Sequence, residues 1–224
     1  MCGLYNLTTA PEAVRSYFGY RDRPNFPPRD RIAPTEPIAI VRMERGERRF
    51  ALVRWGLIPS WMKETKRSRP LINARGETVL EKASFRNAMR RRRCLIPASG
   101  FYEWQGDVPG RKQCHLVARP DGGPIAFAGL WEHWMGPGGE ELESAAIITT
   151  AANAVLQPIH DRMPVIIEPE DFGRWLDAEA VPAEEAATLL KPAADDVLTA
   201  RPIDLVLRPP RRPAAATEAQ PKLL

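Results

Sequence analysis

Four largely apolar stretches follow one another in the middle of the chain, at residues 95–104, 114–118, 125–134 and 144–150. Glycine, proline and aspartate residues lie between them. Stretches of this length that end at turn residues predict β-strands. A succession of short strands joined by turns favours an antiparallel sheet over a helical or a parallel α/β fold.

The N-terminal half adds further predicted strands. Residues 38–43 and 49–55 resemble a hairpin that turns at Arg45-Gly46. Additional strands are expected at 4–7, 165–167 and 203–207. Residues 21–37 are rich in Arg and Pro, so we expect an ordered loop without a regular element there.

Helices are predicted to be few and short. Thr9-Ala10-Pro11-Glu12 resembles a capping box with proline at the first helical position, which predicts a helix through Tyr17. Ser84 is expected to cap a second helix that runs through Arg92. Two more helices are expected at 169–176 and 183–190. These elements together predict one mixed domain in which antiparallel strands dominate.

The composition is that of a globular protein, with 44% hydrophobic and 27% charged residues among 224. No run of about 18 apolar residues occurs, so no membrane span is expected. Polar residues from Asn6 onward argue against a signal peptide. Residues 209–224 are rich in Pro and Ala and lack apolar periodicity, which predicts a disordered tail after the single domain.

The three cysteines, Cys2, Cys94 and Cys114, are odd in number and lack CxxC spacing. This pattern predicts neither a disulfide framework nor a structural zinc site, and a reducing cytoplasm suits it best. We expect no metal and no cofactor. The net charge of +4 and a pI near 9.1 permit nucleic-acid binding without requiring it.

Cys2 directly follows the initiator methionine. Removal of Met1 would give this residue a free α-amine beside its thiol, with reference pKa values of about 7.7–8.0 and about 8.5. Such a 1,2-aminothiol condenses with an aldehyde to an imine and then closes to a five-membered thiazolidine. The alternative is an inert, frayed chain start.

Glu103 lies in the predicted strand 95–104, where it would share a face with Phe101. A carboxylate beside aromatic surface loses hydration, which raises its pKa and suits it to proton transfer near neutral pH. The alternative is an edge carboxylate that points to water.

His160, one of three histidines, stands in Ile159-His160-Asp161-Arg162. Its charged neighbours could tune the imidazole pKa for acid–base work near pH 7, although a lone histidine is more often structural or exposed.

Asn73 and Arg75 belong to a polar segment directly after Leu71-Ile72. An asparagine at a strand end can offer a donor and an acceptor to a reacting centre. Arg75 would lie on the same face and could bind a phosphate in bidentate fashion. The alternative is an Asx-type turn with a surface arginine.

Two basic clusters occur, at 63–69 and 90–93. Basic residues near Trp55 and Trp61 combine phosphate neutralisation with stacking surface, as single-stranded nucleic-acid binding requires. The tryptophans could equally belong to the core, and some of the four consecutive arginines must simply be solvated.

Six blocks now stand in order along the chain: 1–3, 55–61, 73–78, 93–104, 128–131 and 159–165. In letters they are MCG, WGLIPSW, NARGET, RCLIPASGFYEW, AGLW and IHDRMPV. In these blocks the chain resembles the SOS-response-associated peptidase (SRAP) family of abasic-site processing proteins, over residues 2 to about 180. The set Cys2, Asn73, Glu103 and His160 is the specific part of the resemblance.

The resemblance implies an α+β fold with a barrel-like, mostly antiparallel sheet over residues 2–208, and a basic groove leading to Cys2. It also implies that Cys2 forms a thiazolidine cross-link with the ring-opened aldehyde of an abasic site in single-stranded DNA, which shields the lesion during the DNA damage response.

The family also implies individual roles. Asn73 would orient the adduct, Glu103 would move protons, and His160 would assist sugar ring opening and cross-link reversal. Candidate DNA contacts are Arg75, Trp61 and Thr149. The expected protein is a cytoplasmic monomer without a metal, associated with the nucleoid when it is bound to DNA.

Three positions depart from the family pattern. Leu4 replaces a frequent arginine, Arg31 replaces a frequent asparagine, and residues 201–208 lack the usual asparagine-containing segment. These departures concern DNA contacts rather than the reacting residues.

Two other functions stay open. An N-terminal-nucleophile peptidase, as the family's older name suggests, would need an oxyanion hole and an activated Cys2 thiolate. In a non-catalytic DNA-binding module, Cys2 would be incidental.

Overall fold

A closed ring of five strands forms the centre of the computed structural model, which describes residues 2–63, 70–106, 108 and 112–205. Successive neighbours in the ring are β10, β4, β3, β6 and β9, and β9 pairs again with β10. The bounds are β3 Pro37–Glu44, β4 Glu47–Trp55, β6 Arg93–Ala98, β9 Ile125–Met135 and β10 Glu141–Ala151. All these pairings are antiparallel except β10 with β4. The expected α+β fold with a barrel-like, mostly antiparallel sheet is therefore confirmed.

β10 extends the ring with two short strands that matter for the site. β5 (Asn73–Arg75) pairs with it in parallel, and β11 (Arg162–Pro164) pairs with it in antiparallel fashion. The two short strands are almost ninety residues apart in sequence, and both contact the C-terminal half of β10.

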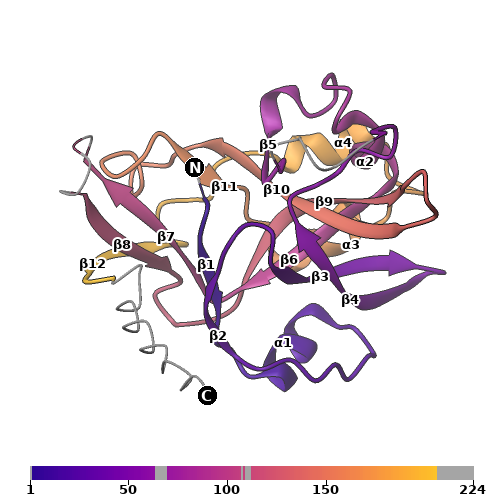
Figure 1. Cartoon of the computed structure of the whole chain (residues 1–224). Helices are drawn as coiled ribbons and strands as arrows, with labels where there is room; N and C mark the ends of the chain where they lie inside the picture. The colour runs from indigo at the N-terminus through magenta and orange to yellow at the C-terminus, as the bar shows by residue number, and fades with distance from the viewer. Residues whose placement is uncertain (1, 64–69, 107, 109–111, 206–224) are drawn as a thin grey trace, which may run out of the picture.

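A second sheet holds the N-terminus. Its order is β12-β8-β7-β1-β2, and it lies to the left of the ring in Figure 1. The bounds are β1 Tyr5–Leu7, β2 Arg29–Ile32, β7 Gly100–Gln105, β8 Gln113–Ala118 and β12 Thr199–Ile203. β1 lies between β7 and β2 in this sheet and pairs with both of them.

The core between the ring and this sheet is aromatic. The Tyr5 ring meets the Trp55 ring edge-on at 5.3 Å and the Phe127 ring at 5.8 Å, and all three side chains are buried. Edge-to-face geometry of this kind adds about 0.5–1.5 kcal/mol to the burial of each aromatic pair. These contacts fix β1 against the ring and make Trp55 a core residue rather than a stacking surface.

The helices are short, as predicted, but their caps differ from the prediction. They are α1 Pro11–Phe18, α2 Arg86–Arg91, α3 Phe172–Leu176 and α4 Ala183–Ala186, with 3-10 turns at Gly76–Thr78, Pro169–Asp171 and Ala187–Leu189. Neither α1 nor α2 has a side-chain cap, and their N-cap residues are Ala10 and Phe85. The Thr9 hydroxyl instead lies 2.7 Å from the Ser99 hydroxyl. The predicted capping box is therefore wrong, because Thr9 uses its hydroxyl for a tertiary contact. The predicted Ser84 cap is also wrong, because the N-cap residue of α2 is Phe85.

The predicted strand 95–104 is in fact two strands, β6 and β7, in different sheets. The chain bends at Ser99, whose hydroxyl oxygen accepts the backbone N–H groups of Thr8 and Thr9, each at 2.9 Å. The next residue is Gly100, and a larger residue would not fit there, because its Cβ would lie 2.8 Å from the backbone oxygen of Val117. The continuous apolar pattern concealed this change of sheet.

Three other predicted boundaries need correction. The segment 21–37 contains β2. The strand expected at 165–167 is replaced by β11 and an isolated bridge between Ile166 and Phe127. The strand expected at 203–207 is β12, which begins at Thr199. The predicted tail 209–224 lies outside the described residues. None of the described helices has the length and hydrophobicity that a bilayer crossing demands.

A candidate active site at the N-terminus

Cys2 lies at the entrance to β1 and is completely buried. Leu4, two residues on, accepts a hydrogen bond through its backbone oxygen from the Tyr102 N–H of β7 at 3.0 Å. The Cys2 backbone oxygen accepts one from Asn73 Nδ2 at 2.9 Å. The first residues are therefore tied to β7 on one side and to β5 on the other.

Asn73 is held in place by the strand that carries it. β5 pairs with β10 through Ile147, and the Trp55 indole N–H donates to the backbone oxygen of Ile72 at 3.0 Å, directly before Asn73. The Asn73 Oδ1 atom is buried and has no hydrogen-bond partner among the described residues. Asn73 therefore anchors Cys2 with its donor, and its acceptor stays available. The Asx-turn alternative is wrong, because Asn73 lies in β5.

Glu103 projects from β7 and is 2% exposed, so the edge-carboxylate alternative is wrong. Burial raises the pKa of its carboxyl group, and the positive amino terminus of the chain acts in the opposite direction. This agrees with the loss of hydration expected from the sequence. A carboxyl group of this kind can hold a proton closer to neutral pH than an exposed glutamate can.

The Cys2 thiol is a weak acid in this environment. Burial raises its pKa, and the nearby Glu103 carboxylate raises it further, while the amino terminus and a backbone hydrogen bond from Leu4 act in the opposite direction. The mutual influence places the Cys2 thiol and the Glu103 carboxylate in one electrostatic neighbourhood. A thiol that stays protonated is a poor nucleophile on its own.

His160 precedes β11 and its side chain is 26% exposed. Its Nδ1 atom accepts the backbone N–H of Arg162 at 3.0 Å, and the Asp161 Oδ1 atom lies 2.8 Å from the same nitrogen. The first contact requires a bare Nδ1 and the second a protonated one. Burial and the positive amino terminus both lower the His160 pKa, although Asp161 opposes them, so the neutral ring with its proton on Nε2 prevails at neutral pH.

The three predicted DNA contacts fall in different environments. Arg75 is exposed on β5, and Trp61 is 58% exposed with its indole N–H near the Ala83 backbone oxygen. Thr149 is fully buried on β10, where its hydroxyl oxygen accepts a hydrogen bond from Arg162 at 3.3 Å. Arg75 and Trp61 are therefore available to a ligand, whereas Thr149 supports its neighbours.

An ion pair between Glu77 and Arg162 joins the segments that carry Asn73 and His160, and sequence reasoning missed it. Arg162 Nη1 donates to Glu77 Oε1 at 2.5 Å, and Nη2 donates to Glu77 Oε2 at 2.9 Å. Both residues stand in blocks that sequence reasoning had already marked, with opposite charges. The opposite charges in these two blocks were the sequence signal from which the ion pair could have been predicted.

Two of the family departures have a structural explanation. Leu4 packs with Tyr102 and Cys114 in a small apolar cluster, so an aliphatic side chain suits its position. Residues 199–203 form β12, which covers the edge of β8. Of the basic clusters, 64–69 lies outside the described residues, and Arg93 is buried rather than available to a ligand.

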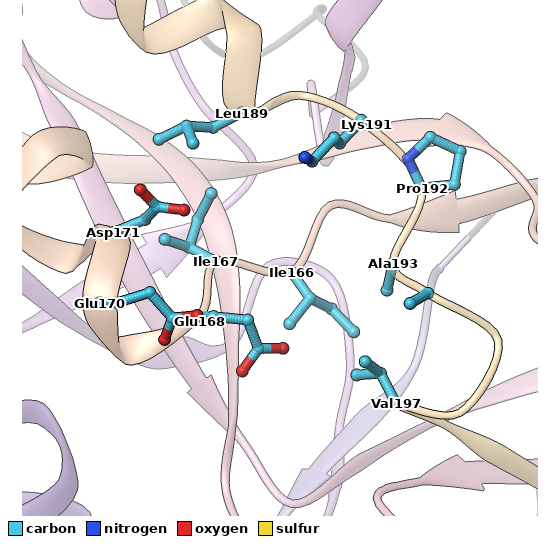
Figure 2. A pocket seen from close by; sticks show the side chains of 11 residues that line it. Ile166, Ile167, Glu168, Glu170, Asp171, Leu189, Lys191, Pro192, Ala193 and Val197 are labelled. Atoms are coloured by element: carbon cyan, nitrogen blue, oxygen red, sulfur yellow. The ribbon is translucent and has the colours of Figure 1, made fainter.

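A hollow of about 230 Å³ lies elsewhere, between the 3-10 turn Pro169–Asp171 and the segment after α4. Figure 2 shows its apolar floor, formed by Ile166, Ile167 and Val197, and the carboxylates of Glu168, Glu170 and Asp171 near it. None of the predicted site residues lines this hollow, and Glu168 is already paired with Arg119 at 2.6 Å. It therefore has no part in the chemistry around Cys2. Among the described residues, no cluster of His, Cys, Asp and Glu could hold a metal ion.

Comparison with known proteins identifies the family of the chain. The family model described as SOS response associated peptidase (SRAP) matches residues 1–208. The chain belongs to the SRAP family. A relative named abasic site processing protein YoqW, from Bacillus subtilis, is 34% identical over 214 residues, which cover 94% of this chain and 96% of the relative. A second relative, named abasic site processing protein HMCES, from Xenopus tropicalis, is 31% identical over 252 residues, which cover 92% of this chain and 74% of the relative.

Solved structures show that the SRAP fold extends over nearly the whole described chain. A protein from Bacteroides thetaiotaomicron superposes with a TM-score of 0.81 at 26% identity, covering 91% of this chain and 92% of that one. A protein from Bordetella bronchiseptica superposes with a TM-score of 0.79 at 30% identity and covers 91% and 100%.

Proposed function

We propose that this SRAP protein processes abasic sites by forming a covalent thiazolidine between Cys2 and the ring-opened aldehyde of an abasic site in single-stranded DNA. The observation that carries the proposal is the Asn73 Nδ2 hydrogen bond to the Cys2 backbone oxygen at 2.9 Å, which fixes Cys2 in the neighbourhood of Glu103. The names of the relatives, which describe abasic site processing, support the same substrate.

The reaction starts only after Met1 has been removed. The freed α-amine of Cys2 attacks the aldehyde carbon, and the carbinolamine loses one water to give an imine. The Cys2 sulfur then adds to the imine carbon, and its proton passes to the nitrogen, which closes the thiazolidine ring. One water is released, no electrons are exchanged, and no cofactor is needed.

The surrounding residues assist particular proton transfers. Glu103, with its raised pKa, gives a proton to the departing hydroxyl group of the carbinolamine and accepts the thiol proton during ring closure. His160 assists opening of the sugar hemiacetal through Nε2–H, and the same proton transfers run backwards during reversal. The reserve acceptor of Asn73, Oδ1, is suited to the N–H of the product ring.

The low acidity of the buried Cys2 thiol bears on the choice of function. A peptidase needs a thiolate that attacks an amide, and burial raises the thiol pKa. In the proposed reaction the amine attacks first and the sulfur adds to an activated imine carbon, so a free thiolate is not required. The chemistry of Cys2 therefore favours cross-linking over peptide hydrolysis.

The decisive experiment incubates the purified chain with single-stranded DNA that carries one abasic site and separates the products on a denaturing gel. We expect a heat-stable adduct with the wild type, none with Cys2→Ala, and with Cys2→Ser only a weaker, reducible adduct because an alcohol closes the ring poorly. Cys94→Ala is the matched control, since that buried cysteine has no α-amine to offer.

Intact mass measurement of the same samples determines whether Met1 has been removed. A heat-stable adduct with Cys2→Ala, or one formed by chains that keep Met1, would refute the proposal. Cleavage of a fluorogenic peptide that depends on Cys2, in the absence of DNA adducts, would establish the peptidase instead.

A further inference from the structure

The Arg162 guanidinium connects three segments around the site. It makes the bidentate pair with Glu77, and its Nη2 atom also donates to the Thr149 backbone oxygen at 2.7 Å. Thr149 lies on β10, between β5 and β11. The Arg162 side chain thus donates to Thr149 on the ring strand β10 and to Glu77 in the turn that follows β5.

These segments carry two of the proposed reacting residues. Glu77 stands in the 3-10 turn Gly76–Thr78, directly after β5 with Asn73. Arg162 begins β11, two residues after His160, and its backbone N–H donates to His160 Nδ1 at 3.0 Å. The ion pair therefore spans the gap between the anchor of Cys2 and the imidazole.

The geometry of this pair is set by bonding and burial together. The Arg162 side chain is 15% exposed and that of Glu77 is 49% exposed. Arg162 Nε is buried and has no hydrogen-bond partner among the described residues. A buried donor without a partner costs free energy. The hydrogen bonds that Nη1 and Nη2 make to Glu77 and Thr149 offset that cost and fix the orientation of the guanidinium plane.

We propose that Glu77 is a positioning residue for the cross-linking reaction, an inference that rests on the proposed function. Its carboxylate orients Arg162, and Arg162 in turn holds the His160 turn against the strand that bears Asn73. Glu77 touches neither the aldehyde nor Cys2 in this scheme. Its contribution is the separation and orientation of the groups that do.

The imidazole of His160 reports on this arrangement. The charged groups that act on it are Asp161, Arg162, Lys112 and the amino terminus of the chain. The Arg162 N–H bond to Nδ1 favours the neutral ring. If the turn loosens without Glu77, that bond weakens and the His160 pKa should change.

The test compares Glu77→Gln and Glu77→Asp with the wild type in full-length, Met1-processed protein. At saturating abasic single-stranded DNA we expect Glu77→Gln to form the cross-link about tenfold more slowly, since small misplacements of reacting groups carry penalties up to about a hundredfold. Glu77→Asp keeps a carboxylate and should restore part of the rate. The DNA concentration at half-saturation should stay unchanged.

A proton NMR titration supplies the second readout. The chain has three histidines, so His115 and His133 serve as internal references. We expect Glu77→Gln to shift the apparent pKa of His160 and leave those of the two reference histidines unchanged. Glu185→Gln is the matched control, because Glu185 is 52% exposed and pairs with Arg174 at 3.2 Å away from Cys2.

The proposal requires both the slower rate and the shifted titration, in a variant whose thermal unfolding matches that of Glu185→Gln. It is overturned if either is absent. It is also overturned if Glu77→Gln binds DNA more tightly at an unchanged maximal rate, because Glu77 would then merely compete with phosphate for Arg162. If the wild type forms no cross-link, the proposed function is refuted. The His160 titration then still shows whether Glu77 positions the His160 turn.

Discussion

Arg93 donates a hydrogen bond from Nε to the backbone oxygen of Trp175 at 2.5 Å, and its side chain is almost fully buried. Its Nη1 atom donates to the backbone oxygen of Met89, and its Nη2 atom donates to those of Asp177 and Val181. This arginine therefore closes the end of α3 against β6 through main-chain acceptors. Burial lowers its pKa, but not enough to threaten its charge.

We expect Arg93→Lys to destabilise the fold by about 2–3 kcal/mol, because an ammonium group cannot reach four spread carbonyl oxygens and each one left unpaired costs about 1–3 kcal/mol. Urea unfolding measures this loss. Arg90→Lys, at an exposed position of the same run, is the control and should change stability by less than about 0.5 kcal/mol. Equal stability of the two variants would contradict the structural role of Arg93.

Asn73→Ala removes the anchor of the Cys2 backbone oxygen. The loss of one hydrogen bond worth about 1 kcal/mol corresponds to about a fivefold slower cross-linking reaction, and more if the product ring also uses Oδ1. Single-turnover kinetics on abasic single-stranded DNA measure the rate. Asn87→Ala, an exposed substitution on α2, should leave it unchanged. An unaffected rate in Asn73→Ala would show that Cys2 needs no anchor.

Glu103→Gln should slow cross-linking by about a hundredfold or more, the usual contribution of a positioned acid–base group. In the wild type the rate should fall at high pH as Glu103 loses its proton, and it should fall at low pH as the α-amine becomes protonated. The substitution should remove the high-pH decline only. A profile in Glu103→Gln that matches the wild type would exclude proton transfer by this residue.

The same substitution should make the fold more stable at neutral pH. The folded-state pKa of Glu103 is raised by burial, so the folded chain binds more protons than the unfolded chain between the unfolded pKa, about 4.3, and the raised value. Stability is therefore lost as pH rises through that window, and Glu103→Gln should abolish this loss. Thermal unfolding at several pH values tests it, and an unchanged pH dependence would contradict it.

Gly100→Ala should destabilise the fold by about 1–3 kcal/mol, because the new Cβ would lie 2.8 Å from the Val117 backbone oxygen and the two strands must separate. Gly173→Ala is the matched control. It lies in α3 with nothing within 4 Å of its Cβ position and should be neutral or stabilising by up to about 1 kcal/mol. Thermal unfolding compares the two, and equal effects would rule out steric pressure at Gly100.

The sequence predicted local properties better than partners. The hairpin 38–55 was confirmed because its turn, Arg45-Gly46, is encoded within the segment and both residues adopt positive φ. The burial of Glu103 followed from its aromatic neighbours. Caps failed where a distant hydroxyl competed, as Ser99 does for Thr9.

The missed features all depend on contacts between distant segments. The division of 95–104 between two sheets requires Thr8 and Thr9, about ninety residues earlier. Arg93 is buried, unlike Arg90 in the same cluster, because it contacts α3, and the ion pair between Glu77 and Arg162 is held in place by β10. A pattern within one window carries no information about such pairings, although the family resemblance brought the correct blocks together. The roles of Cys2, Asn73, Glu103 and His160 stay predictions until the kinetics are measured.

The pairing of β1 with β7 sets the order in which the beginning of the chain can become enclosed. On the ribosome, the strand that covers Cys2 is made roughly a hundred residues after it, which takes about 5–20 s at ordinary elongation rates. β2 and Asn73, which also contact this part of the chain, are made earlier, but one side of the N-terminal segment stays uncovered until β7 pairs with β1. We therefore expect an aminopeptidase to remove Met1, as the proposed function requires, before β7 encloses Cys2.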